Sequence, residues 1–329
     1  MWAWNIRQMG VLDLPALVGR VLSATGAQKL GLVAHSQGTT QTLVALAKEQ
    51  RPDLGERISV FCALAPAAYT GPLIGKMYFK FMRLISPGAF RVFFGIHAFI
   101  PFMMTMHSLL PGNLYGALGP VYVSAESMRW WLGRECFAKQ KCILQTREEW
   151  REEDKQDRVE EGKRASPAVA AADAESGVED VERSESHSHK ASTSRHDHRT
   201  RPFALWVAGS DLLVDGRRLL RRFASGREPH VRVVHQKVIE EYEHLDVIWA
   251  VDVVEKVGRE VKEVLWATCE GREGWRVPVG CEEVDVWDGN GVVGRGKEKC
   301  GEGSWSAEGS GESEIEETGR ARVKPRGRL

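Results

Sequence analysis

The sequence predicts an α/β protein with a parallel sheet that is flanked by helices. Apolar runs of strand length occupy residues 29–34, 203–208 and 231–235, and the runs are continuous, which is typical of strands that are buried on both faces. Helical patterns lie on either side of the first run, over residues 13–25 and 39–47, so helices and strands alternate. The runs at 29–34 and 203–208 each end in a short polar segment, and a polar loop follows the third.

The helix at 13–25 has a recognisable start. Asp13 is a plausible N-cap, and Pro15 falls in the first turn, where its missing N–H costs nothing. The run at 29–34 follows this helix and would be a central strand in a complete sheet. The segments after it supply strands for only one flank, so its other edge is expected to be unpaired and prone to aggregation.

Ser36 stands where the first strand run meets the next helix. Small residues, Ala34 and Gly38, lie two positions on either side of it, as a sharp strand-to-helix turn requires. Such a nucleophile elbow presents a serine hydroxyl above a parallel sheet, although glycine is usual where Ala34 stands. The alternative is that Ser36 is an ordinary helix N-cap.

A nucleophilic serine needs a base and an orienting carboxylate. Asp211 follows the strand run at 203–208, and His244 lies in the loop after the run at 231–235. Both therefore fall at the carboxyl edge of a parallel sheet, where Ser36 is presented. Asp215 is a rival to Asp211 within one helical turn, and His244 could instead be a surface histidine in an acidic loop. His35 is expected to pack under the elbow rather than to act chemically.

Four segments carry a resemblance to a known family: 33–40, 63–66, 207–215 and 242–250. They resemble the acid lipases, a family of gastric and lysosomal lipases and fungal sterol ester hydrolases, over roughly residues 1–147 and 201–267. The resemblance implies Ser36 as nucleophile, Asp211 as triad acid and His244 as base. Asp215 matches a second, non-catalytic aspartate.

The resemblance implies an α/β-hydrolase fold with a helical cap and hydrolysis of a sterol ester or triacylglycerol, with no cofactor and no metal. The backbone N–H of Gln37 is the expected oxyanion-hole donor. Only thirty-five residues precede Ser36, so the early strands and the second oxyanion donor are expected to be missing and the fold to be partial. The alternative is an inactive truncated relic or a membrane-anchored, lipid-associated protein.

Composition shifts divide the chain into five segments. We expect the elbow half of the core at residues 1–70 and an apolar helical cap insert at 71–147. A disordered charged linker is expected at 148–201, the Asp/His half of the core at 202–268, and a disordered Gly/Glu/Lys-rich tail at 269–329. Residues 89–110 are apolar enough for a membrane span, but Pro101 and two glycines favour broken cap helices. Both interpretations predict association with a membrane or a lipid droplet.

Composition also excludes several classes of function. The formal net charge is zero, and no basic stripe indicates nucleic acid. The six cysteines show no Cys-x-x-Cys spacing, so zinc ribbons and redox dithiols are not predicted. Cys136 and Cys142 are close enough in sequence to pair, but free thiols are expected. A histidine-containing tract at 187–198 is at best a weak metal site. Nothing in the sequence identifies a protein partner.

Overall fold

The computed structural model describes residues 4–75, 97–99, 122–124, 130–131, 141–165 and 194–293. A four-stranded sheet forms the centre, and all its neighbouring strands are parallel. Its order is β1-β2-β5-β6, with β1 at Leu30–His35, β2 at Ile58–Leu64, β5 at Phe203–Ala208 and β6 at Val233–Ile239. The predicted α/β class with a parallel sheet and flanking helices is confirmed.

The helices that flank this sheet come from both halves of the chain. The α-helices are α1 (Ile6–Gln8), α2 (Leu14–Thr25), α3 (Gln37–Ala45), α8 (Arg147–Ala165), α11 (Gly216–Ala224), α12 (Asp246–Trp249) and α13 (Arg259–Ala267). The shorter 3-10 and π-helical segments are η1 (Met9–Asp13), η2 (Pro52–Arg57), η3 (Pro72–Gly75), η5 (Val254–Gly258) and η6 (Arg272–Gly274).

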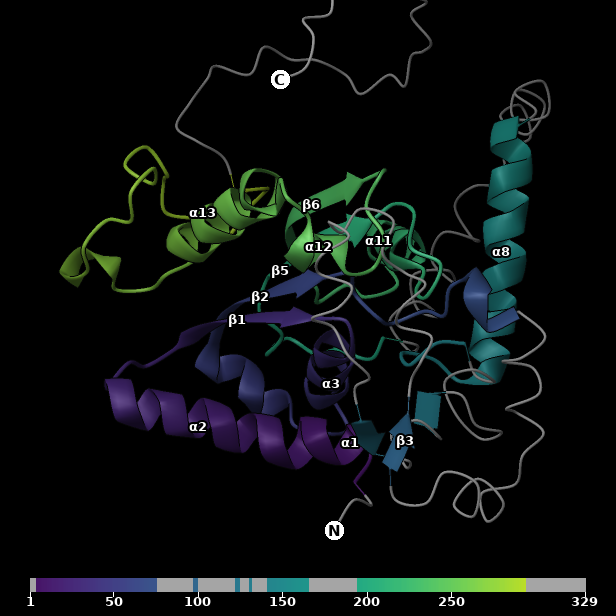
Figure 1. Ribbon diagram of the computed structural model, residues 1–329, viewed down its shortest axis with the longest axis horizontal. Coiled ribbons are helices and arrows are strands. Elements are labelled where there is room, and N and C mark those ends of the chain that lie inside the picture. Colours follow the sequence, from purple (N-terminus) through teal and green to yellow (C-terminus); the bar gives the residue numbers. More distant parts are fainter. Residues whose placement is uncertain are drawn as a thin grey trace, which may run out of the picture. The chain divides into compact units, whose positions relative to one another are not determined.

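The pleat of the strands sends alternate side chains into two separate cores. Phe61 and Ala63 of β2 join the core that α2, α3 and α11 cover, whereas Cys62 and Leu64 join the core under α12 and α13. Figure 1 shows α2 and α3 on one side of the sheet and α13 on the other. Trp206 of β5 is fully buried in the second core. Burial on both faces explains why the run that forms β5 is continuously apolar, since every residue of β5 is buried, whereas β1 has exposed positions.

The first helical run begins earlier than the sequence predicts. Asn5 is its cap, because the Asn5 side chain accepts from the N–H of Gln8 and the Gln8 side chain accepts from the N–H of Asn5. The run continues through η1 into α2, so Asp13 lies inside helical backbone and makes no capping bond. The prediction that Asp13 caps the helix is therefore wrong. Pro15 does occupy the first turn of α2.

Within the described part of the chain, β1 has β2 as its one partner strand. It therefore lies at an edge of this sheet, as predicted for a chain that supplies strands on only one of its flanks. Val33 of β1 is 42% exposed, although it belongs to an apolar strand. An unpaired, apolar strand edge of this kind favours association with other strands.

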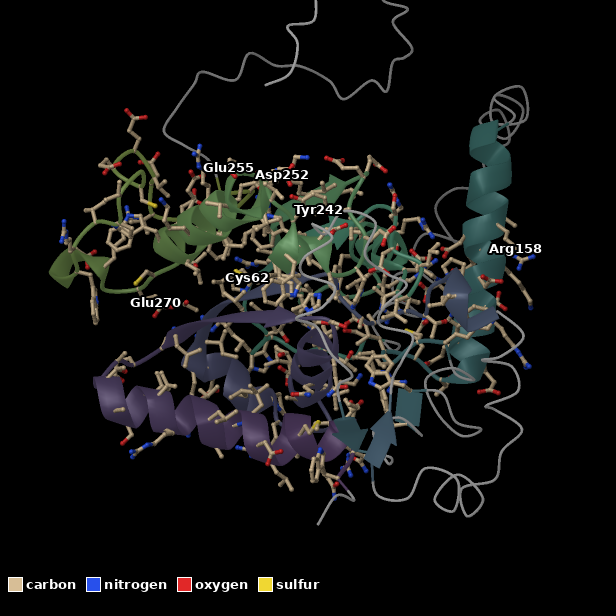
Figure 2. The ribbon with its side chains drawn as sticks, in the orientation of Figure 1. Cys62, Arg158, Tyr242, Asp252, Glu255 and Glu270 are labelled. Carbon is tan, nitrogen blue, oxygen red and sulfur yellow. The ribbon has the colours of Figure 1, made fainter. Side chains whose placement is uncertain are left out.

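The prediction that residues 148–201 form a disordered linker is wrong at both ends of that segment. Helix α8 occupies its first part, and Glu153 of α8 is buried against Arg222 of α11, with 3.1 Å between Oε2 and Nη1. Arg158, on the outer side of α8, is 78% exposed at its side chain and points away (Figure 2). The composition argument failed because paired charges can be buried where apolar residues are few.

Residues 194–201, at the other end, also pack into the structure. Ser194 and His196 are buried, and both bond to Glu228, whose carboxylate also binds Arg222. Burial raises the pKa of Glu228, but hydrogen bonds from His196 and the charge of Arg222 outweigh it, and the pKa falls to about 2. Residues 166–193 of the predicted linker lie outside the described residues.

The first part of the predicted disordered tail is also folded. Cys281 and Val284 are buried and pack against Trp266 of α13, and Trp287 packs on the same cluster. The disorder prediction is therefore wrong for residues 269–293, because apolar side chains that are widely spaced in this segment pack against Trp266 of α13. Residues 294–329 lie outside the described residues.

Most of the predicted cap, including the greater part of 89–110, lies outside the described residues. Where the structure describes it, strand β3 (His97–Phe99) pairs antiparallel with β4 (Tyr122–Ser124), so the expectation of a helical cap insert is wrong for these two segments. Across the described ranges, we find no helix with the length and apolarity that crossing a bilayer demands.

Candidate active site

Ser36 lies on a strained turn between β1 and α3. Its φ of 49° and ψ of −115° lie outside the regions that ordinary residues prefer. The turn is held to the sheet because the Ser36 N–H donates to the carbonyl of Leu64, at 3.1 Å. A Cβ at Gly38 would lie 3.3 Å from the Cβ of Ala34, which is tighter than most contacts. Gly38 therefore accommodates the alanine that replaces the more usual glycine before the elbow.

His244 and Asp211 form a hydrogen-bonded chain with Ser36. The Nε2 atom of His244 lies 2.6 Å from Oγ of Ser36, and its Nδ1 lies 2.6 Å from Oδ2 of Asp211. The side chains of His244 and Asp211 are 3% and 2% exposed. An ionised carboxylate only accepts, so Nδ1 of His244 carries the proton and Nε2 is free to accept the hydroxyl proton.

The two aspartates of the loop after β5 have different partners. The second oxygen of Asp211, Oδ1, accepts from the N–H groups of Leu213 and Val214, at 2.8 and 3.1 Å. Asp215 instead caps α11, accepting from the N–H of Arg218 at 2.9 Å. The structure therefore brings Asp211, and not Asp215, to His244.

The aspartate and histidine loops also contact each other through their backbones. A Cβ at Gly209 would lie 2.5 Å from Cα of Glu240, so only glycine permits this approach. The N–H of Ser210 donates to the carbonyl of Tyr242 at 2.9 Å, and the Ser210 hydroxyl donates to the carbonyl of Glu240 at 2.7 Å. These contacts hold the loop of His244 against the loop of Asp211 at the carboxyl edge of β5 and β6.

His35 makes a contact that sequence reasoning did not find. Its Nε2 lies 3.0 Å from the carbonyl oxygen of His244, and the two rings lie 5.1 Å apart at 48°. Burial, and to a lesser extent the neighbouring His244, lower the pKa of His35 to about 4, against smaller opposing effects. No local signal in the sequence indicates a bond to a residue 209 positions away.

Gln37 is the first residue of α3, so its N–H has no carbonyl acceptor one turn earlier in the helix. This is the position from which an N–H can face an anion beside Ser36. Its side chain joins two other segments, because Oε1 accepts from the indole of Trp131 at 3.0 Å and Nε2 lies 3.7 Å from the sulfur of Met9.

The described residues contain no group of three or more His, Cys, Asp or Glu side chains that could hold a metal. In the histidine-containing tract, His196 binds Glu228 and Asp197 binds Arg199, while His187 and His189 lie outside the described residues. Cys142 is a buried free thiol, and its burial raises its pKa to about 12. The expectation of a free thiol is therefore confirmed for Cys142, while Cys136 lies outside the described residues.

No protein-family model matches the chain. It is 30% identical over 303 residues to sterol esterase 2 of Saccharomyces cerevisiae, and this match covers 80% of this chain and 52% of that protein. It is 40% identical over 103 residues to gastric triacylglycerol lipase of Bos taurus, covering 30% of this chain and 24% of the lipase. The chain thus spans about half the length of the sterol esterase and less of the gastric lipase.

Among solved structures, a monoglyceride lipase from Saccharomyces cerevisiae is similar with a TM-score of 0.47 and 15% identity. The similarity covers 78% of this chain and 68% of that one.

Proposed function

We propose that this chain, a sequence relative of the acid lipases within the α/β-hydrolases, carries the catalytic centre of a serine carboxylic ester hydrolase. One observation carries the proposal. The chain of contacts from Ser36 through His244 to Asp211, with 2.6 Å at both steps, combines nucleophile, base and orienting acid on three neighbouring loops.

The mechanism is acyl transfer to water. His244 accepts the Ser36 hydroxyl proton at Nε2 as Oγ attacks the ester carbonyl, and Asp211 stabilises the resulting imidazolium through Nδ1–H. The N–H of Gln37 donates to the oxyanion of the tetrahedral intermediate. His244 then protonates the leaving alcohol. Water, deprotonated by His244, attacks the acyl-enzyme and releases the carboxylic acid, which restores the Ser36 hydroxyl.

The substrate class follows from the relatives and from the apolar insert. A protein named sterol esterase and others named gastric triacylglycerol lipase are both similar to this chain. We infer that the substrate is a lipid ester, either a sterol ester or a triacylglycerol, taken from a lipid droplet or membrane surface. Comparing hydrolysis of cholesteryl oleate with that of triolein, both in the same emulsion, separates the two substrates.

A fluorophosphonate probe tests the proposal, because it labels only an activated serine. We expect the probe to be found on Ser36 by peptide mass spectrometry, and Ser36→Ala to abolish labelling. The matched control is Ser225→Ala, because the Ser225 hydroxyl, at the end of α11, donates to the carbonyl of Arg222 and not to a histidine. Labelling that is absent from the wild type would favour the inactive, lipid-associated alternative. Labelling that persists in Ser36→Ala would show that the activated serine is not Ser36.

A further inference from the structure

His244 has three anchoring contacts, of which the catalytic proposal uses two. Its ring nitrogens face Ser36 and Asp211, and its backbone carbonyl oxygen faces Nε2 of His35 at 3.0 Å. A carbonyl oxygen can only accept, so Nε2 of His35 must carry a proton and donate. The neutral form of His35 is therefore the Nε2–H tautomer.

The location of this donor gives the contact its significance. His35 is the last residue of β1 and precedes Ser36 directly, and β1 is held in parallel register with β2 as far as the pair His35 and Leu64. The strand that presents the nucleophile thus also holds the backbone of the base. Any movement of β1 relative to the loop of His244 is opposed at a point next to the reacting atoms.

We propose that His35 is a positioning residue: its Nε2–H bond to the carbonyl of His244 sets the distance between the base and the Ser36 hydroxyl. This inference rests on the proposed esterase function. The Oγ–Nε2 distance of 2.6 Å needs both residues fixed, and a displacement of about 1 Å in a catalytic pair lowers turnover by about 100-fold.

The environment of His35 keeps this donor uncharged while the base works. The groups that act electrostatically on His35 are His244, which lowers its pKa, and Asp211, which raises it, and burial has the largest effect. A pKa of about 4 leaves the His35 imidazole neutral at neutral pH. A neutral donor holds the loop without placing a second positive charge 5.1 Å from the imidazolium that forms on His244.

Two substitutions at His35 separate the bond from simple packing. His35→Phe keeps an aromatic ring but removes the donor. His35→Gln keeps a donor, because its amide nitrogen is the same number of bonds from Cβ as Nε2 of histidine. We expect His35→Phe to lower kcat on p-nitrophenyl butyrate by about 30- to 100-fold, with KM changed less than about threefold. The same variant should slow fluorophosphonate labelling of Ser36 similarly. His35→Gln should stay within about fivefold of the wild type in both assays.

A purely structural role for His35 predicts a different result. In that case both variants would lose thermal stability and labelling together, and His35→Gln would not rescue the rate. Equal labelling rates for wild type and His35→Phe, at equal thermal midpoints, would also overturn the proposal.

Nuclear magnetic resonance of ¹⁵N-histidine-labelled protein gives a readout that does not need turnover. The ring of His35, assigned by its loss in His35→Phe, should be the Nε2–H tautomer and should not titrate between pH 5 and pH 8. A neutral ring protonated on Nδ1 instead of Nε2 would contradict the bond. If the fluorophosphonate probe never labels the wild type, the proposed function fails. The spectra then still show whether His35 donates to the carbonyl of His244.

Discussion

Replacing Asp211 by asparagine, with Asp215→Asn as the matched control, tests which carboxylate serves the base. Asparagine keeps an Oδ1 acceptor for the N–H groups of Leu213 and Val214, so the loop should retain its conformation. Its amide NH₂ would face Nδ1 of His244, and two donors cannot bond to each other. His244 would therefore shift to the Nε2–H tautomer, which cannot accept the Ser36 proton.

The magnitude follows from the geometry. The carboxylate and the imidazolium touch at 2.6 Å between Oδ2 and Nδ1, and their charges are spread over each group. Charge centres about 4 Å apart attract by about 4 kcal/mol at an effective dielectric constant of about 20, which corresponds to about 10³ in rate. Loss of the correct tautomer adds to this, so we expect Asp211→Asn to lower kcat by about 10⁴-fold.

The assay is hydrolysis of p-nitrophenyl butyrate, together with the rate of fluorophosphonate labelling at Ser36. Asp215→Asn should remain within about threefold of the wild type, because asparagine is as good a helix N-cap as aspartate. Thermal denaturation of all three proteins shows whether each is folded. If Asp215→Asn is inactive and Asp211→Asn is nearly unaffected, the assignment of the acid is wrong.

Three further predictions concern stability and association. Arg222→Met should lower the free energy of unfolding, measured by urea denaturation, by about 3 kcal/mol, because it removes the arginine that pairs with two buried carboxylates; Arg227 still pairs with Glu153, and His196 with Glu228, which keeps the loss from being larger. The exposed Arg217→Met should cost less than about 1 kcal/mol, and equal losses would refute the buried network. The Glu228 pKa of about 2, below its usual 4.5, adds about 3 kcal/mol of stability that is fully present above pH 4.5 and is lost as the pH falls toward 2. The urea midpoint of Glu228→Gln should therefore fall less than that of the wild type between these pH values, and an equal fall in both proteins would contradict this. Val33→Lys on the open edge of β1 should reduce self-association measured by light scattering, and unchanged association would exclude this edge as its cause.

How much of the site was predictable depends on how local each signal is. Ser36, Asp211 and His244 stand just after strands or in the loop that follows one, and parallel strands bring their carboxyl ends to one edge. Chain order and strand pattern were therefore enough to nominate them. The sequence could rank Asp211 against Asp215 but could not decide between them by geometry. The two aspartates lie four positions apart in one loop, and what distinguishes them is the direction of their side chains.

The linker prediction failed for a related reason. Residues 147–165 have few large apolar side chains, and their composition is that of a segment without a core. The burial of Glu153 depends on Arg222, which lies 69 positions further along the chain, and no local pattern records such a pair.

The sequence by itself determined the parallel α/β architecture, the elbow at Ser36 and the order of the three candidate catalytic residues, since strand periodicity and turn chemistry are local properties. Only the tertiary structure decided that Asp211 rather than Asp215 meets His244, that His35 holds the His244 carbonyl, and that charged α8 is folded. Each of these depends on distances between segments remote in sequence, and packing of the two helical layers against the sheet sets those distances.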